Sequence, residues 1–243
     1  MFRFAVILAV PAAILAQIRP AIPVPSEMRL TSFAGRTVAY HVVDGYAVTD
    51  GDILIGRDEN ASKARAGGVI ARAGQLWPGG LVPYIVDATL TNTSRLTNAM
   101  AEWTAKTPLR FVPRTNQANY LKFARAPAAY TCNSYAGMQG GEQPVNLGDS
   151  CSDFAVVHEL GHAIGFWHEQ SRNDRDQYIQ MQFDNVTLAC VYNYDKYGAQ
   201  GREASPYDYA SSMHYFPYAY SRNGLPVMVT IPAGTTAARK STA

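Results

Sequence analysis

The chain has 243 residues, of which 47% are hydrophobic and 16% are charged, and its formal net charge is +2 at pH 7. This composition suits one globular domain with extensions, and the small charge argues against a nucleic-acid partner or binding to an anionic membrane surface. No stretch reaches the roughly 20 uninterrupted apolar residues of a membrane span. We therefore expect neither nucleic-acid binding nor a membrane span.

The first residues follow the pattern of a secretory signal peptide. Arg3 supplies a positive charge, residues 4–15 are mostly apolar, and Ala16 offers a small residue before a cleavage site. A buried N-terminal helix is the alternative interpretation. We expect a signal peptide over residues 1–16 and a secreted, extracellular protein. Secretion would also suit a glycoprotein, since Asn-x-Ser/Thr triplets begin at Asn60, Asn92 and Asn185.

Residues 17–65 differ in composition from the rest of the chain. They begin with a cluster of prolines, and the small, basic run at 63–68 has the character of an exposed, cleavable linker. We predict a propeptide over 17–65 and the main domain over 66–243. The run Asp50-Gly51-Asp52 lies inside this propeptide, and taken alone it is most simply a turn.

Short strands and one helix are predicted in the first part of the main domain. Strand-like segments occur at 80–86, 109–112 and 120–124. Leu96, Met100 and Trp103 recur at helical spacing and predict an amphipathic helix over 93–106.

Residues 158–169 (HELGHAIGFWHE) hold three of the five histidines of the chain. His158 and His162 are four residues apart, which places them on one face of a helix. Gly165 permits a turn that can bring His168 back to the same point. Three neutral imidazoles and an open position are typical of a catalytic zinc site, because a structural site has four protein ligands.

Glu159 follows the first of these histidines and would lie near the ion without binding it. A bare His-Glu-x-x-His pair can also be a chance helix face. The third histidine, and Met213 in the downstream run Ser-Met-His-Tyr, argue against that alternative. The complete pattern is typical of the metzincin zinc peptidases.

Longer matches carry a resemblance to the astacin family of zinc endopeptidases (metzincins, peptidase family M12A). They lie at Trp77–Gly80, Arg110–Thr115, Gly140–Gln143, Gly165–Arg172, Asp174–Asp176 and Ser212–Tyr215. The resemblance implies an α+β fold, namely a two-lobed metzincin (zincin-like) catalytic domain. Its N-terminal lobe would have a mixed sheet with two long helices, its C-terminal lobe would be irregular, and the active-site cleft would lie between them. One Zn²⁺ per chain and protein or peptide substrates are implied as well.

The resemblance also implies roles for single residues. Glu159 would be the catalytic base, and Tyr215 would stabilise the oxyanion and approach the metal as a fifth ligand. Asp52 matches the aspartate of the family propeptide that binds zinc in the latent proenzyme, although Thr49 replaces the usual aromatic residue. Met213 would form an apolar floor beneath the metal. The propeptide would therefore be the inhibitor of its own enzyme.

The three cysteines are interpreted through the same resemblance. Cys132 and Cys151 match a family disulfide beside the active site. Residues 133–138 would then form the edge strand of the sheet, to which an extended peptide substrate can add. Pro108 replaces one cysteine of a second family disulfide, so Cys190 is expected to be a free buried thiol or to pair with another chain.

The function expected is that of a secreted, monomeric zinc endopeptidase made as a zymogen. A catalytically silent zinc-binding or adhesion domain is the alternative. A truncated, inactive product is a further alternative, because the chain after Met213 is shorter than the family pattern. Glu169 would either bind the new α-amino group after propeptide removal or fix the orientation of His168.

Overall fold

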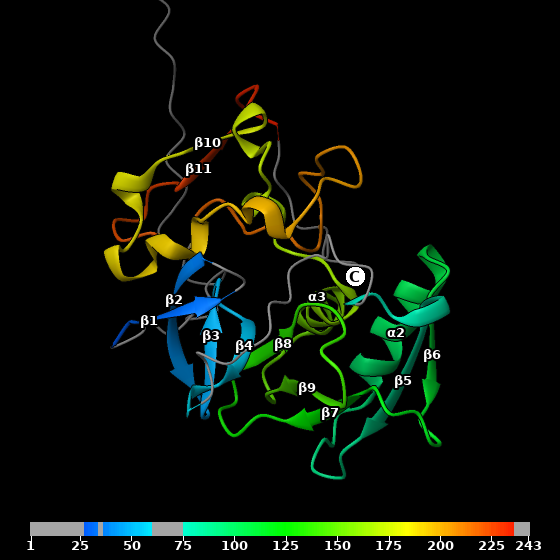
Figure 1. The fold of residues 1–243 in the computed structure, drawn as a ribbon. Helices are drawn as coiled ribbons and strands as arrows, with labels where there is room; N and C mark the ends of the chain where they lie inside the picture. Colours follow the sequence, from blue (N-terminus) through cyan, green and yellow to red (C-terminus); the bar gives the residue numbers. More distant parts are fainter. Residues whose placement is uncertain (1–26, 34–35, 60–74, 236–243) are drawn as a thin grey trace, which may run out of the picture.

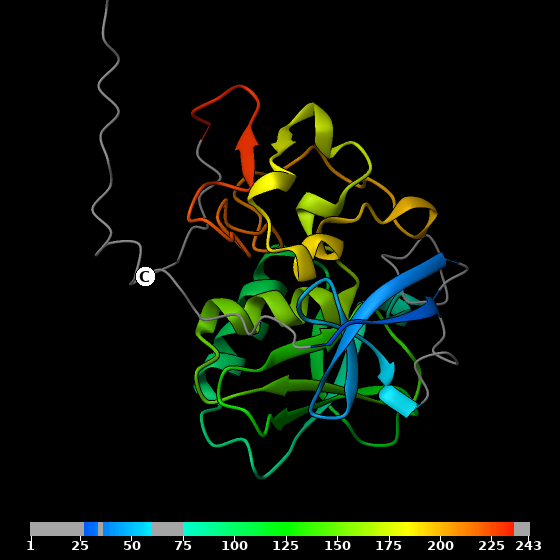
Figure 2. The same ribbon diagram turned by 90° about the vertical axis from the view of Figure 1, so that its left-hand side faces the viewer.

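The computed structural model describes residues 27–33, 36–59 and 75–235. The expected signal peptide, the linker at 63–68 and the triplet at Asn60 lie outside the described residues. Figure 1 shows a sheet that is continued on one side by strands from the N-terminal segment, with the C-terminal lobe above it. Figure 1 and Figure 2 both place helix α3 (Asp153–Ile164) between the sheet and the C-terminal lobe. Among the described residues no helix has both the length and the apolar character needed to cross a bilayer.

Nine strands of the described residues form one sheet in the order β1-β2-β3-β4-β8-β9-β7-β5-β6. In chain order they are β1 (Arg29–Phe33), β2 (Arg36–Val43), β3 (Tyr46–Thr49), β4 (Ile53–Arg57), β5 (Leu81–Val86), β6 (Arg110–Pro113), β7 (Tyr120–Arg125), β8 (Cys132–Tyr135) and β9 (Glu142–Leu147). Strands β6, β5, β7 and β9 are parallel, and β8 is antiparallel to β9. The mixed sheet and the three predicted strands are confirmed.

Helices α2 (Ser94–Lys106) and α3 cover the sheet and enclose the main hydrophobic core. Trp103 is partly buried and packs against this core, and its Nε1–H donates a hydrogen bond of 2.9 Å to the carbonyl of Val157. The two helices are thereby joined through a side chain as well as by packing. The two long helices of the expected fold are confirmed.

The N-terminal segment forms an antiparallel meander, β1–β4, that the sequence analysis did not predict. Asp44 and Gly45 connect β2 to β3 with φ angles of 50° and 77°. Positive φ at both central residues is the mark of a hairpin turn that matches the twist of its strands, and Asp-Gly favours this turn. This dipeptide between two apolar runs was the signal that could have revealed the hairpin.

The expected edge strand is not an edge in this chain. Strand β8 pairs with β9 on one side and with β4 on the other, where Ile53 lies opposite Ser134 and Leu54 opposite Tyr135. The pairing with β4 is parallel. The expectation that residues 133–138 form an edge strand was therefore wrong, because β4 of the N-terminal segment pairs with the outer side of β8.

The C-terminal lobe has little regular structure, as expected. Its described residues include a small sheet of β10 (Ile179–Met181) and β11 (Met228–Thr230). The lobe also contains short 3-10 helices at Glu169–Ser171, Arg175–Gln177, Phe183–Asn185, Leu188–Tyr194 and Gly198–Gln200. A further 3-10 helix, Pro78–Gly80, lies in the N-terminal lobe just before β5. Arg175 is 5% exposed and donates to the carbonyls of Gln170 and Tyr194, which ties these segments together.

Candidate active site

Three imidazole nitrogens and one carboxylate converge on a single point. Nε2 of His158 lies 3.0 Å from Nε2 of His162 and 3.2 Å from Nε2 of His168. The Asp52 carboxylate oxygens lie 3.2 Å from Nε2 of His158, 3.4 Å from that of His162 and 3.2 Å from that of His168. Ligand atoms around a tetrahedral zinc ion with bonds of about 2.0–2.1 Å are about 3.3 Å apart. These four residues therefore fit the coordination sphere of one zinc ion.

The orientation of two of the imidazoles is set by backbone carbonyl groups. Nδ1 of His158 lies 2.7 Å from the carbonyl oxygen of Ser212, and Nδ1 of His162 lies 2.7 Å from that of Phe166. A carbonyl can only accept, so each Nδ1 carries the proton and each Nε2 keeps its lone pair. This is the arrangement by which proteins prepare histidine to bind a metal.

His168 is fully buried and comes from the segment that follows the helix. Burial lowers the pKa of His168 to about 3, so the ring is neutral at physiological pH. Asp52 Oδ1 is buried as well and accepts no hydrogen bond from a described residue. A cation at the point of convergence would satisfy this oxygen and the three nitrogen lone pairs together.

Local sequence explains how α3 brings the histidines together. Ser152 caps the start of the helix, and its side chain accepts a hydrogen bond from the N–H of Ala155. Gly165 ends the helix with φ of 118°, and its N–H bonds to the carbonyls of Gly161 and His162. The left-handed backbone of Gly165 redirects the chain so that His168 returns to the other two histidines.

Glu159 and Met213 also lie at the centre. Glu159 follows His158 in α3 and is 2% exposed. Gly161 lies on the same helix so close to Met213 that a Cβ atom at position 161 would overlap the Met213 sulfur. Met213 is therefore packed directly against the zinc-binding helix, in agreement with its expected place beneath the site.

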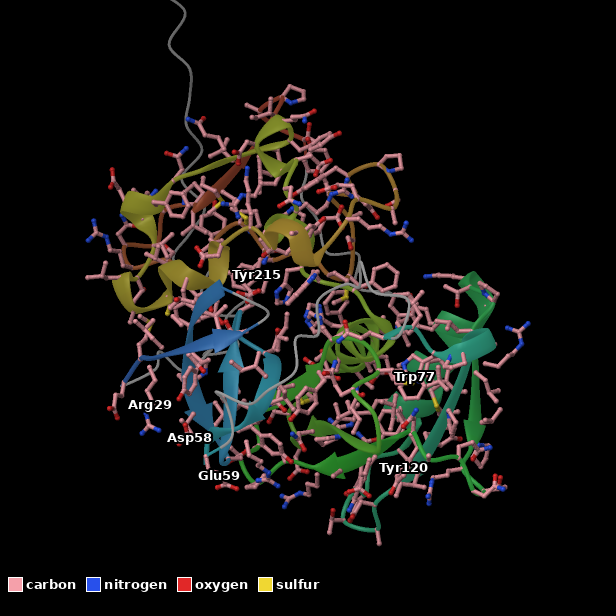
Figure 3. The ribbon with its side chains drawn as sticks, viewed as in Figure 1. Arg29, Asp58, Glu59, Trp77, Tyr120 and Tyr215 are labelled. Atoms are coloured by element: carbon pink, nitrogen blue, oxygen red, sulfur yellow. A yellow bond between two sulfur atoms is a disulfide. The ribbon has the colours of Figure 1, made fainter. Side chains whose placement is uncertain are left out.

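Tyr215 faces the N-terminal segment. Its hydroxyl donates a hydrogen bond to the backbone carbonyl of Asp50, and its ring centroid lies 4.5 Å from that of His168. Figure 3 shows Tyr215 at the junction between the C-terminal lobe and the N-terminal strands. Burial raises the pKa of Tyr215 well above its ordinary value, so the phenol remains a protonated donor.

The turn between β3 and β4 fills the space in front of the histidines. Asp50 and Gly51 both have positive φ, 49° and 86°. A Cβ atom at Gly51 would overlap the hydroxyl groups of Tyr215 and Tyr220. The run Asp50-Gly51-Asp52 is thus a turn, as its composition indicated, and it also carries Asp52 to the histidines.

Glu169 lies beside a neighbouring cavity of about 840 Å³. Its Oε1 accepts hydrogen bonds of 3.0 Å from Arg172 Nη1 and 3.0 Å from the N–H of Asp208. Burial raises the pKa of Glu169, although both contacts oppose this shift. The contact with Asp208 joins segments far apart along the chain, so it could not be predicted from local sequence.

The cysteines are arranged as expected. Cys132 and Cys151 form a disulfide with a Cα–Cα distance of 6.0 Å, which confirms the predicted pair. It joins the start of β8 to the loop before α3. Cys190 is free and fully buried in the described part of the chain, in agreement with the first of its two interpretations.

Similarity to known proteins agrees with this geometry. The sequence profile of a family described as Astacin (Peptidase family M12A) matches residues 69–240. The chain is 41% identical over 161 residues to zinc metalloproteinase nas-14 of Caenorhabditis elegans, a match that covers 64% of this chain and 32% of that protein. It is 36% identical over 226 residues to zinc metalloproteinase nas-6 of the same organism, covering 87% of this chain and 64% of that protein.

A solved structure shares the fold. High choriolytic enzyme 1, a hatching enzyme zinc-protease from Oryzias latipes (Medaka fish), is similar with a TM-score of 0.59 and 31% identity, over 68% of this chain and 82% of that chain. Blastula protease 10 of Paracentrotus lividus is 41% identical over 169 residues, which cover 64% of this chain and 28% of that protein. The chain thus spans about a third of the length of nas-14 and of blastula protease 10.

Proposed function

The chain belongs to the astacin family of zinc metallopeptidases, peptidase family M12A, and from this premise we propose that it hydrolyses internal peptide bonds of protein substrates. The single observation that carries the proposal is the convergence of His158, His162 and His168 on one point, with Glu159 beside them on α3. A site that only binds zinc has no need of a buried carboxylate that is not a ligand.

The proposed reaction gives each residue of the site a distinct chemical role. Zinc, when bound, polarises the substrate carbonyl and makes a water molecule more acidic. Glu159 accepts the proton from the attacking water and later donates it to the leaving amine. The Tyr215 hydroxyl, once released from the carbonyl of Asp50, donates a hydrogen bond to the oxygen on which negative charge develops.

We further propose that the chain is a zymogen, with a signal peptide at 1–16, a propeptide at 17–65 and the peptidase domain at 66–243. Three contacts support this inhibition by the N-terminal segment. The Asp52 carboxylate lies among the three imidazoles, the carbonyl of Asp50 engages Tyr215, and β4 pairs with β8. Each of them occupies a position that a substrate or the attacking water would need.

Secretion of a monomeric glycoprotein completes the proposal. The disulfide between Cys132 and Cys151 supports folding in an oxidising compartment. Asn92 is exposed, which suits an N-linked glycan.

Replacing Glu159 tests the proposed function. We expect Glu159→Gln to retain about one zinc ion per chain, because Glu159 is not a proposed ligand, and to cleave casein at least about 100-fold more slowly than the wild type after trimming within residues 60–74. Zinc content is measured by mass spectrometry and cleavage by fluorescent casein. Wild-type rates for the variant would refute the role of Glu159. A trimmed wild-type chain that binds zinc and cleaves nothing would instead favour the silent zinc-binding domain.

A further inference from the structure

A small cluster of buried apolar side chains lies beside the candidate metal centre. Ile53, the first residue of β4, is fully buried and packs in a cluster with Ala136, Trp167 and Tyr197. These three residues are 1%, 5% and 4% exposed. We name the space they enclose around the Ile53 side chain the Ile53 pocket.

The Ile53 pocket is next to the proposed reaction centre, because Ile53 directly follows Asp52 in the sequence. Asp52, the preceding residue, places its carboxylate oxygens 3.2 Å from Nε2 of His158 and of His168. Consecutive Cα atoms are only about 3.8 Å apart. Ile53 also lies in register with Ser134 of β8, the strand to which an extended peptide can add. A peptide that replaced the N-terminal segment along β8 would therefore bring a side chain next to its cleaved bond into this pocket.

The residues that line the Ile53 pocket are positioned by contacts that do not involve the N-terminal segment. The backbone N–H of Tyr197 donates to the carbonyl of Ser171 at 2.9 Å, and its hydroxyl donates to Glu203 at 3.2 Å. The rings of Trp167 and Tyr197 are stacked, with centroids 6.4 Å apart and an angle of 19°.

The wall formed by Ala136 is anchored in the same way. Its carbonyl accepts a hydrogen bond of 2.7 Å from Gln139 Nε2, and the N–H of Gly137 donates to the carbonyl of His162 at 2.8 Å. The pocket therefore keeps its shape when the N-terminal segment leaves.

We propose that the Ile53 pocket is a substrate subsite that selects an aliphatic side chain (valine, isoleucine or leucine) next to the cleaved bond. This inference rests on the proposed endopeptidase function and names its substrate class. Alanine would leave the pocket partly empty, and each missing methylene group weakens transition-state binding by about tenfold or more. A carboxylate or ammonium group would lose its hydration among mainly apolar walls, which costs free energy.

A peptide library provides the test. The full zinc-loaded chain is opened by limited trypsin digestion at Lys63, Arg65 or Arg72, and trypsin is then inhibited. The peptides lack Lys and Arg and vary within two residues of the cleaved bond. We expect one position to favour aliphatic residues over alanine and aspartate by at least about tenfold in kcat/KM. Cleavage without such a preference overturns the subsite, whereas no cleavage of any peptide overturns the endopeptidase function itself.

Ala136→Val provides a second test, because it fills the pocket. We expect the ratio of kcat/KM for isoleucine over alanine peptides to fall below one, and an unchanged ratio overturns the proposal. The exposed Ala128→Val is the matched control and should keep the wild-type ratio.

The uncleaved chain gives a reading that is independent of activity. Ala136→Val should lower the Tm of the full chain, because Ile53 no longer fits, and adding Ile53→Ala should restore much of the loss. If Ala136→Val does not fold alone, the double variant supplies the ratio. A double variant that is less stable than both single variants contradicts the proposed fit between these side chains.

Discussion

Gly51 lies so close to the hydroxyl group of Tyr220 that a Cβ atom at position 51 would overlap the phenol oxygen. The Tyr215 hydroxyl reaches the same place from its own side. Gly51 also has φ of 86°, a conformation that residues with a side chain rarely adopt. Two tyrosines of the C-terminal lobe thus require glycine at the turn that carries Asp52.

Gly51→Ala should therefore weaken the docking of the N-terminal segment. The strained backbone alone costs about 1–2 kcal/mol, and the overlap with both phenols adds to it. We expect a lower Tm of the full chain and faster tryptic digestion of residues 27–59. Gly79→Ala is the matched control, because Gly79 has φ of 62° and nothing within 4 Å of its Cβ position. Equal losses of Tm in the two variants would show that the tyrosines do not matter.

Asp52→Asn should activate the uncleaved chain, because it removes the charge at position 52 but keeps the size of the side chain. The amide carries no negative charge, so it binds the metal more weakly than the carboxylate does. We expect the uncleaved variant to hydrolyse a fluorogenic peptide at least about tenfold faster than the uncleaved wild type. Asp44→Asn, at the exposed β2–β3 turn, should leave the full chain latent. If Asp52→Asn stays as silent as the wild type, the carboxylate does not hold the chain inactive.

Much of the centre follows from local sequence. The pair His158 and His162 depends only on helical spacing, and Gly165 only on a left-handed residue at the end of that helix. To place His168 beside the other two histidines, we also had to assume that the chain turns back after α3. The spacing of the motif supported this assumption. Such features involve neighbours in sequence, and they were predictable for that reason.

The partner of β8 could not be predicted in this way. Its pairing with β4 joins residues about eighty positions apart, and nothing in either segment specifies the other. The meander β1–β4 left one readable sign, the dipeptide Asp44-Gly45, but a turn signal does not tell where the hairpin will dock. The same limit applies to the Ile53 pocket, whose walls come from three separate segments.

Acid should loosen the docked N-terminal segment through His41 of β2. His41 Nδ1 lies 2.8 Å from the hydroxyl of Tyr192 in the C-terminal lobe, and burial lowers the pKa of His41 below its usual 6.5. The docked chain therefore binds fewer protons than the undocked chain, and docking loses stability as pH falls below about 6.5. Burial raises the pKa of Tyr192, so this phenol does not titrate in that range.

The measurement for His41 is the Tm of the full chain at about pH 7.5 and about pH 5.5. We expect a larger fall in the wild type than in His41→Gln, since glutamine can accept from Tyr192 but cannot be protonated. An identical fall in both proteins would assign the acid sensitivity to other groups.

Removing the disulfide should destabilise the domain without unfolding the metal centre. Cys132 and Cys151 close a loop with a sequence separation of 19, and a crosslink of this length contributes about 3 kcal/mol through the entropy of the unfolded chain. We expect Cys132→Ala/Cys151→Ala to lower the Tm by about 6–12 °C. Mild reduction should lower the Tm of the wild type similarly and leave the double variant unchanged. A further drop for the reduced double variant would point to a different target of the reductant.

The inhibition that we propose would depend on dilution, because β4 and β5 belong to one covalent chain. While the backbone between Glu59 and Gln75 is intact, the N-terminal strands would compete with substrate at an effective concentration on the order of millimolar, whatever the concentration of the protein. After one cut, the N-terminal strands form a separate fragment, and its rebinding depends on its concentration. A high concentration of the nicked chain would therefore keep it inhibited, and dilution would complete the activation.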